Sequence, residues 1–234
     1  MWHGLGKSLA VAAVLTLAFA ASASAATLAD WEMNEGSGAT TMIDSSGNHV
    51  NGTIGSAVQT GVSILGATAY QWPFASPTAP PAKPERIVQA NSNSLNPGSG
   101  TYTVSLRFRT NQHFGNIVQK GQAGASGGYF KIENPNGRIN CVFRGRNSSG
   151  TLVRKAVQAS QVTSDNQWHV ATCTRTSTGL TLTIDGAVAG TARGSTGSIS
   201  NTRPVTIGGK LNCDQINTTC DYFTGAIDWV RISN

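Results

Sequence analysis

Acidic residues are the first candidates for catalysis in this sequence. Asp30 and Glu32 share a stretch that alternates like a β-strand, and the other acids are scattered through turns. A retaining glycoside hydrolase needs two carboxyl groups about 5–5.5 Å apart. Because no second pair of acids shares a strand, the sequence disfavours hydrolysis by that mechanism.

A second candidate chemistry is the β-elimination of a polysaccharide lyase. In such an enzyme arginine neutralises the uronate, and tyrosine or histidine moves the proton. The tripeptide Tyr129–Lys131 and the pair Arg107 and Arg109 fit this scheme, but the longer arginine, glutamine and histidine blocks of lyases are absent from the sequence. The solvated face of one strand explains Arg107 and Arg109 more simply. The sequence therefore leans away from an enzyme, with a lyase and a glycoside hydrolase as alternatives.

A run of cations without intervening acids is the main charge feature of the chain. The formal net charge is +6. Arginine forks suit the planar carboxylate and sulfate groups of anionic polysaccharides. Nucleic-acid binding is disfavoured because the motifs and interleaved aromatics of known readers are absent from the sequence. The alternative to ligand binding is a basic strand pair that is only solvated. The candidate ligand-binding cations are Arg138, Arg144, Arg146, Arg154 and Lys155.

Two aromatic residues are candidates for stacking against a sugar ring. Trp72 precedes the proline-rich stretch 73–84, and Tyr222 follows a loop between two cysteines. They are the aromatic residues least committed to a core pattern, and sugar-binding sandwiches stack a pyranose on an exposed ring. We therefore predict that Trp72 and Tyr222 contribute to a carbohydrate site.

The first 25 residues have the pattern of a secretory signal peptide. Lys7 supplies the positive charge, Leu9–Ala21 is apolar, and Ala23 and Ala25 are the small residues of a cleavage site. The apolar stretch is shorter than the ~20 residues that span a bilayer. We predict cleavage after Ala25, which makes 26–234 a secreted, extracellular chain without a membrane span. The sequence leaves the oligomeric state open.

All four cysteines follow the predicted leader, an even number in an oxidising compartment. Four cysteines allow three pairings. Cys213 and Cys220 bracket a short polar loop and are predicted to pair locally. That leaves Cys141 with Cys173, in two strand-like runs that could be neighbours in one sheet. A zinc site has no support, because the sequence has neither a CxxC spacing nor a nearby histidine pair.

Strand patterns dominate the chain after the leader. Thr101–Arg109 alternates between apolar and polar residues, and Asp185-Gly186 suits the positive φ angles of a two-residue hairpin turn. Short strands separated by turn residues are typical of an antiparallel sandwich or barrel. Residues 26–72 look too strand-poor for a separate core, so we predict one domain over 26–234. Further strands are predicted at residues 31–33, 86–89, 116–120, 129–133, 138–144, 151–156, 169–175, 180–184, 187–189, 205–207 and 226–232.

Three groups of motifs occur in the order of a known family. Residues 31–38 (WEMNEGSG) precede 44–48 (DSSGN), 166–173 (NQWHVATC) precede the hairpin turn, and 222–232 (YFTGAIDWVRI) close the chain. Together they resemble the laminin G-like branch of the concanavalin A-like lectin/glucanase superfamily, in its bacterial secreted form. The resemblance spans essentially the whole mature chain. It implies an all-β fold, a two-sheet antiparallel β-sandwich (jelly roll) whose first and last strands lie side by side.

The resemblance also implies a structural calcium ion where the 44–48 loop meets the final strand. Asp44 and Asp228 would supply carboxylates, and Gly47 and Asn48 would supply carbonyl or amide oxygens. Ca²⁺ binds six to eight oxygens of these kinds. Asn34 departs from the family pattern, in which an acidic residue is common. The alternative is a metal-free polar latch, in which Asp44 begins an Asx-turn and Asp228 bonds loop amides.

The sequence is therefore interpreted as a secreted carbohydrate-binding or adhesive module. Its expected partner is a polysaccharide or glycoconjugate, anionic ligands included, and its expected cofactor is structural calcium. A protein-binding laminin G-like module without a sugar site is an alternative, beside the polysaccharide-degrading enzymes. The fold alone cannot choose among these functions, because one fold hosts several.

Overall fold

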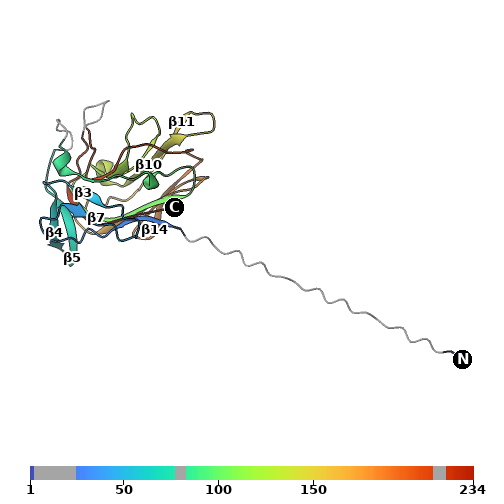
Figure 1. Cartoon of the computed structure of the whole chain (residues 1–234), viewed down its shortest axis with the longest axis horizontal. Helices are drawn as coiled ribbons and strands as arrows, with labels where there is room; N and C mark the ends of the chain where they lie inside the picture. The colour runs from blue at the N-terminus through green and yellow to red at the C-terminus, as the bar shows by residue number, and fades with distance from the viewer. Residues whose placement is uncertain (3–24, 77–82, 213–219) are drawn as a thin grey trace.

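The predicted all-β architecture is confirmed by the computed structural model, which describes residues 1–2, 25–76, 83–212 and 220–234. Two antiparallel sheets of eight strands each pack into a sandwich (Figure 1). In the described ranges the helical elements are three short 3₁₀ turns, at Pro84–Arg86, Asn93–Leu95 and Pro135–Gly137. None of the helices in these ranges is long and apolar enough to cross a membrane.

The first sheet, sheet A, joins the two ends of the described chain. Its strands are β1 (Thr27–Trp31), β4 (Gln59–Ile64), β5 (Ala67–Trp72), β7 (Tyr102–Arg109), β12 (His169–Arg175), β13 (Gly179–Ile184), β14 (Ala187–Arg193) and β16 (Gly225–Ser233). They lie in the order β14-β13-β12-β7-β16-β5-β4, and β1 also pairs with β16. The first and last strands thus lie side by side, as the resemblance implied.

The second sheet, sheet B, collects shorter strands from distant parts of the chain. They are β2 (Thr41–Met42), β3 (Gly52–Ile54), β6 (Val88–Ala90), β8 (Asn116–Lys120), β9 (Tyr129–Glu133), β10 (Asn140–Arg146), β11 (Leu152–Gln158) and β15 (Val205–Ile207). Their order is β11-β10-β9-β8-β15-β6-β3-β2. Strands from both halves of the sequence therefore share one outward face.

The core lies between the sheets, and strand alternation selects the residues that fill it. In β7 the predicted inward set, Tyr102, Val104, Leu106 and Phe108, is fully buried. Successive side chains of a strand point to opposite faces, so the polar residues of β7 face outward. The predicted hairpin turn is also confirmed, because Asp185 and Gly186 both have positive φ angles, 51° and 81°.

The prediction that residues 26–72 are strand-poor is wrong. This segment forms β1 to β5 and contributes strands to both sheets. The hairpin of β4 and β5 turns through Leu65 and Gly66, with φ angles of 47° and 82°. A leucine is a poor signal for a left-handed turn, because only glycine, asparagine and aspartate adopt that region readily. The strands of this segment complete the two sheets instead of forming a core of their own.

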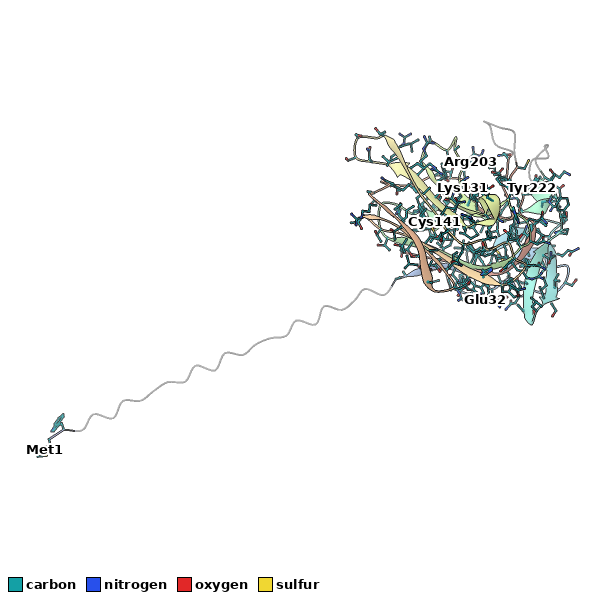
Figure 2. The ribbon with its side chains drawn as sticks, turned by 180° about the vertical axis from the view of Figure 1, so that it is seen from behind. Met1, Glu32, Lys131, Cys141, Arg203 and Tyr222 are labelled. Carbon is teal, nitrogen blue, oxygen red and sulfur yellow. A yellow bond between two sulfur atoms is a disulfide. The ribbon has the colours of Figure 1, made fainter. Side chains whose placement is uncertain are left out.

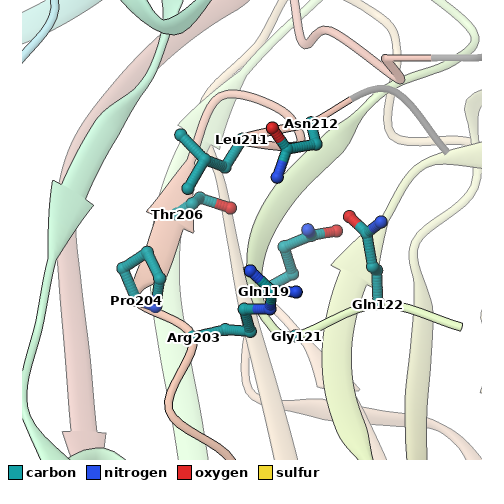
Figure 3. A pocket seen from close by; sticks show the side chains of 8 residues that line it. All are labelled: Gln119, Gly121, Gln122, Arg203, Pro204, Thr206, Leu211 and Asn212. Carbon is teal, nitrogen blue, oxygen red and sulfur yellow. The ribbon is translucent and has the colours of Figure 1, made fainter. Parts of the chain in front are cut away.

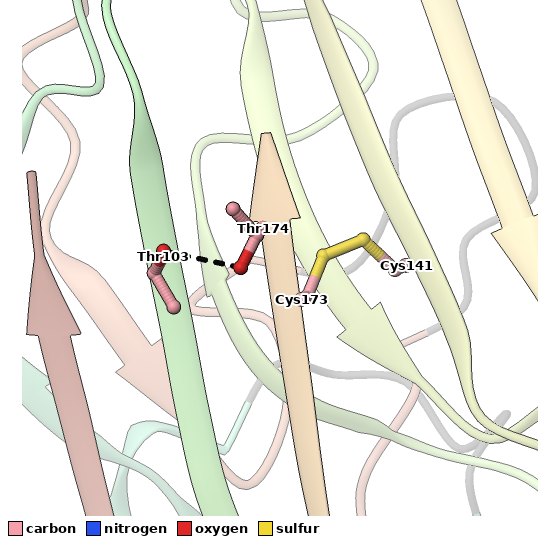
Figure 4. Close-up of a disulfide and its surroundings, with 4 residues drawn as sticks. All are labelled: Thr103, Cys141, Cys173 and Thr174. Carbon is pink, nitrogen blue, oxygen red and sulfur yellow. Dashed lines mark hydrogen bonds between the residues drawn. A yellow bond between two sulfur atoms is a disulfide. The ribbon is translucent and has the colours of Figure 1, made fainter. Parts of the chain in front are cut away.

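The predicted disulfide between Cys141 and Cys173 is confirmed, but the predicted placement is wrong. Cys141 lies in β10 of sheet B and Cys173 in β12 of sheet A, so the bond crosses the core between the sheets and does not join neighbouring strands (Figure 4). Both cysteines are fully buried. The predicted partner of Cys220, Cys213, lies outside the described residues, and no cysteine of the described part is free.

Candidate functional site

A row of polar residues crosses the outward face of sheet B. Thr53 of β3 lies opposite Gln89 of β6, and Gln89 lies opposite Thr206 of β15. Thr206 in turn lies opposite Gln119 of β8, which lies opposite Lys131 of β9. Their strand neighbours alternate with them and point into the core. Five adjacent strands thus carry hydroxyl, amide and ammonium groups along one line, of which Thr206 and Gln119 are only 2 % and 3 % exposed.

Two adjoining hollows lie over this row. The first is small, with about 20 Å³ accessible to a water-sized molecule, and the side chains of Gln119, Gln122 and Arg203 converge on it (Figure 3). The second, of about 30 Å³, is lined by the same two glutamines together with Tyr129 and Lys131. Both hollows therefore combine amide groups with cations, the donor types that bind sugar hydroxyls and carboxylates.

The lysine of the row is held by a carboxylate of its own strand. Lys131 Nζ pairs with Glu133 Oε2, and Glu133 Oε1 accepts a hydrogen bond of 2.8 Å from Asn140 Nδ2. Figure 2 shows Lys131 and Arg203 on the side of the molecule opposite to Glu32, which follows β1 of sheet A. A lysine ammonium has three N–H donors, so one carboxylate contact leaves room for a ligand.

The predicted basic residues extend the hollows toward the edge of sheet B. Arg144 lies directly opposite Arg154 of β11 on one side and opposite Tyr129 of β9 on the other. Arg144 Nη1 donates to the carbonyl of Ala123 at 3.2 Å, and Ala123 lines the second hollow. The structure thus brings Arg144 and Arg154 together beside the polar row, a connection that the sequence did not predict.

The other three predicted cations lie apart from this pair. Arg146 is two residues beyond Arg144 on the same face and donates to the carbonyls of Ser126 and Gly150. Lys155 lies opposite the buried Phe143, on the other face of the sheet. Arg138 precedes β10 and is exposed. None of the five predicted cations forms an ion pair with a carboxylate of the described residues.

The prediction that Trp72 and Tyr222 offer exposed rings is wrong. Each is 1 % exposed, because Trp72 points inward from β5 and Tyr222 packs in a small buried cluster. Trp72 Nε1 donates to the carbonyl of Arg86 at 3.0 Å, and the Tyr222 hydroxyl accepts from the backbone of Lys83. Neither ring can stack on a sugar in this arrangement.

The exposed aromatic side chains of the described residues lie elsewhere. Phe74 is 72 % exposed and Phe114 is 40 % exposed. Phe74 lies two positions after Trp72. An exposed aromatic ring thus does lie beside the proline-rich stretch, but it belongs to Phe74 and not to Trp72. An alternating strand buries Trp72, and the chain leaves the sheet directly after it.

The candidate calcium ligand Asp44 is saturated by hydrogen bonds. Its Oδ1 accepts from the backbone N–H groups of Asp30 at 2.9 Å and Ser46 at 3.0 Å. Its Oδ2 accepts from the Ser46 hydroxyl at 2.8 Å and the Val50 N–H at 2.9 Å. Burial opposes ionisation of Asp44, but these bonds outweigh it and lower the pKa of the carboxyl group. Asp44 therefore forms the Asx-turn of the predicted polar latch, whereas Asp228, the other part of that prediction, pairs with Arg107.

The other three candidate calcium ligands do not complete a metal site around Asp44. Asp228 pairs with Arg107 at 2.6 Å on the outward face of sheet A. Asn48 Nδ2 donates to the carbonyl of Thr27 at 2.8 Å, and Gly47 supplies the positive φ of the turn. The four lone-pair sites of the Asp44 carboxylate all face N–H and O–H donors, so no lone pair remains to bind a cation. The four residues as they lie do not fit a calcium ion.

The acids considered for glycoside hydrolysis are also paired. Arg231 of β16 donates to Asp30 at 2.8 Å and to Glu32 at 2.6 Å. Both carboxylates are therefore bound by one guanidinium on the outward face of sheet A. This fits an ion-pair cluster better than a pair of catalytic acids lining a cleft.

Several residues of the polar face were missed by the sequence analysis. Gln119 lies in the short strand β8 (NIVQK), and Gln122 lies in the loop after it. Arg203, Lys210 and Asp221 lie far along the chain, in segments without a repeated pattern. The signal that could have identified Gln119 is its alternation with the core residues of β8, but its partners depend on the order of the strands.

Comparisons with known proteins agree with this architecture. A family model of the laminin G type, described as the concanavalin A-like lectin/glucanases superfamily, matches residues 85–234. No curated protein matches the chain in sequence.

Solved structures with the same fold include receptor-binding domains of botulinum neurotoxins. One, from work on cell entry of botulinum neurotoxin type C through two ganglioside molecules, has a TM-score of 0.62, 13 % identity, and coverage of 89 % of this chain and 47 % of that chain. The binding domain of botulinum neurotoxin DC in complex with SialylT has a TM-score of 0.61, 15 % identity, and coverage of 89 % and 47 %.

A third similar structure is the same neurotoxin binding domain in complex with rat synaptotagmin II. It has a TM-score of 0.61, 14 % identity, and coverage of 89 % of this chain and 48 % of that chain. This chain therefore spans about half the length of the structures it matches. At these identities the likeness shows the fold. Since the family model covers well over half of the sequence, the chain belongs to the concanavalin A-like lectin/glucanases superfamily, in its laminin G-like branch.

Proposed function

We propose that this chain is a secreted binding module that holds an anionic polysaccharide or glycoconjugate on the outward face of sheet B. One observation carries the proposal: the hollow lined by Gln119, Tyr129 and Lys131 continues into the cross-strand pair Arg144 and Arg154. Cations and amides are thus aligned on one face of the molecule.

The chemistry of this face suits a sugar that carries a carboxylate or sulfate. Guanidinium and ammonium groups make charge-assisted hydrogen bonds to such anions, which are about twice as strong as neutral ones. The amides of Gln119 and Gln122 can donate to and accept from sugar hydroxyls. The two hollows are shallow, with about 20 and 30 Å³ accessible to a water-sized molecule. A sugar residue of a longer chain would therefore lie across them and contact the polar groups that line them.

Two further observations support the proposal. The segment before residue 26 has the pattern of a signal peptide, which would deliver the module to extracellular glycans. Structures of the same fold have been solved with SialylT and in work on ganglioside binding, so the fold is compatible with acidic glycoconjugates. A fold hosts many functions, and the argument therefore rests on the residues of the site.

The experiment is a calorimetric titration of the mature protein with a uronic acid oligosaccharide, a sulfated oligosaccharide and a neutral oligosaccharide. We expect binding of an anionic ligand that weakens as salt is added, because salt screens exposed charges. The double variant Arg144→Gln/Arg154→Gln should bind at least about tenfold more weakly, since each charged hydrogen bond is worth about 1.5–3 kcal/mol.

A matched control separates this site from the general positive charge of the protein. Arg193 ends β14 in sheet A and is exposed. Arg193→Gln removes a charge as the site variants do, but should leave the affinity within about twofold. Equal loss in the control, or equal affinity for the neutral ligand, would show that sheet B holds no anion site.

A variant within the hollow tests the amides. Gln119→Ala removes one of the two side chains that both hollows share. We expect weaker binding of the anionic oligosaccharide with an unchanged dependence on salt, because the lost contacts are uncharged. Unchanged affinity in Gln119→Ala together with loss in the arginine double variant would confine the site to the strand pair β10 and β11.

A further inference from the structure

Three polar side chains meet in a buried cluster behind the second hollow. Lys210 Nζ lies 2.6 Å from Asp221 Oδ2. Asn116 Nδ2 lies 3.4 Å from the same oxygen and donates to Gln119 Oε1 at 2.7 Å. Lys210 and Asp221 are each 5 % exposed, and Asn116 is 1 % exposed. An amine, a carboxyl group and a carboxamide are thus collected around one oxygen atom away from solvent.

The backbone fixes this arrangement. The N–H of Asn116 donates to the carbonyl of Asp221 at 2.8 Å, so the two side chains start from adjacent positions. The N–H of Lys210 donates to the carbonyl of Cys220 at 3.0 Å, next to Asp221 in the chain. Main-chain hydrogen bonds therefore fix the positions of all three residues independently of the contacts between their side chains.

One polar atom of the cluster makes no hydrogen bond with the described residues. Asn116 Oδ1 is buried and has no hydrogen-bond partner. An unpaired buried acceptor costs about 1–3 kcal/mol. A buried ion pair such as Lys210 and Asp221 also costs desolvation energy. The cluster is therefore an energetically costly arrangement of reactive groups, and a reaction that removes charge from it would be favourable.

We propose that Lys210 and Asn116 form an intramolecular isopeptide bond, with Asp221 as the proton carrier. The Nζ atom of Lys210 would attack the Cγ atom of Asn116. The new link would join β8 to the segment that follows β15, at the edge of the second hollow. Lys210 also lines the second hollow, but the bond is detected by mass and its test does not depend on glycan binding.

The reaction balances without an oxidant or another co-reactant. The proton of the Lys210 ammonium passes to the Asp221 carboxylate, and the neutral amine adds to Asn116 Cγ. The Cγ–Nδ2 bond then breaks as the Asp221 carboxyl group gives its proton to Nδ2 and takes the second proton from Nζ. A secondary amide between Nζ and Cγ remains, Asp221 ends as a neutral carboxyl group, and one ammonia molecule leaves.

The geometry favours this course because Asn116 Nδ2, which becomes the leaving group, already lies against the carboxyl oxygen that would protonate it. The product is a neutral amide in place of a buried ion pair.

The chain contains a matched control. Lys131, Glu133 and Asn140 form a second cluster of a lysine, a carboxylate and an asparagine, in which Glu133 contacts both Lys131 Nζ and Asn140 Nδ2. The Lys131 and Glu133 side chains are 22 % and 12 % exposed, against 5 % and 7 % for Lys210 and Asp221. Water reaches this second cluster, and we expect it not to react.

The test is the intact mass of the reduced mature protein. We expect the wild type and Lys131→Arg to be lighter than their sequences by the mass of one ammonia molecule. Lys210→Arg, Asn116→Ala and Asp221→Ala should have their full sequence masses. Peptide mapping should identify one branched peptide that contains residues 116 and 210.

Two outcomes would overturn the proposal. One is a wild-type mass equal to that of the sequence. The other is an ammonia loss that persists in Lys210→Arg, which would indicate cyclisation of an asparagine elsewhere. Both masses are measured on denatured protein, so the measurement is possible whether or not a variant folds.

Discussion

His169 Nδ1 lies 2.7 Å from Asp185 Oδ2, so the imidazole connects the start of β12 to the turn of the following hairpin. The other ring nitrogen, Nε2, lies 3.0 Å from Asp165 Oδ1. Burial alone lowers the pKa of His169, but the hydrogen bonds and charges of Asp185 and Asp165 outweigh it, and the pKa is raised above its ordinary value of 6.5. When protonated, the histidine therefore forms a charged bridge between two loops.

This bridge predicts a pH dependence of stability. A raised folded-state pKa contributes stability that is fully present below about pH 6.5 and lost as the pH rises through the folded value. Both aspartates are half exposed, so solvent screening limits the effect to about 1 kcal/mol or less. Urea unfolding from pH 5.5 to 8.5 should show this loss in the wild type. His169→Gln should show a flatter profile, and identical profiles would contradict the prediction.

The disulfide between the sheets predicts a large loss of stability on its removal. Cys141 and Cys173 are separated by 32 residues, so the bond limits the freedom of the unfolded chain. Such bonds typically contribute about 2–4 kcal/mol. The double variant Cys141→Ala/Cys173→Ala should unfold at a lower urea concentration by that free energy. A loss below about 0.5 kcal/mol would mean that packing alone holds the two sheets together.

Arg175 is a buried guanidinium held by backbone carbonyls. It points inward from β12 and donates to the carbonyls of Pro97, Gly98, Gly100 and Gly197. Its ring contact is Phe143, 5.5 Å from the guanidinium carbon. Burial lowers its pKa, although the hydrogen bonds are those of a cation.

Removal of Arg175 should be strongly destabilising. Arg175→Met keeps the length of the stem but leaves four carbonyls without their donor, and the expected loss is about 3–5 kcal/mol. Arg175→Lys should retain only part of the free energy of unfolding that the methionine variant loses, because an ammonium lacks the planar fork of donors. Equal stabilities of the methionine variant and the wild type in urea would show that the loops do not depend on this residue.

The saturated carboxylate of Asp44 predicts the result of calcium removal. Because its lone pairs face N–H and O–H donors, the melting temperature should be the same with calcium and with EDTA. Asp44→Ala should be destabilised by about 2 kcal/mol in both conditions, as for the loss of a strong helix cap. If calcium raised the melting temperature of the wild type but not that of Asp228→Ala, this result would instead establish the calcium site that the family resemblance implies.

Local pattern predicted much of the secondary structure. The strand limits at 116–120, 129–133, 169–175 and 205–207 agree with β8, β9, β12 and β15. These strands alternate between apolar and polar residues or lie between clear turns, and both signals are local. The hairpin of β4 and β5 was missed because its turn residue Leu65 carries no local signal for a positive φ.

The candidate site depended on information that is not local. Trp72 was expected at the surface because of the prolines that follow it, but the pairing of β5 with β16 turns its ring into the core. Asp44 was expected to bind a metal, but the fold places N–H groups from β1 and from its own loop around it. In each case the deciding neighbours come from another part of the chain.

The sequence by itself determined the all-β class, the inward residues of β7 and the pairing of Cys141 with Cys173, which follow from alternation, turn chemistry and cysteine number. The family was indicated by the resemblance of three groups of motifs. The tertiary structure decided which residues share the face of sheet B. The period of a strand shows which of its residues point the same way, but only the order β8-β15-β6 places Gln119, Thr206 and Gln89 in one row. That order is set by long-range pairing and core packing, which no single segment encodes.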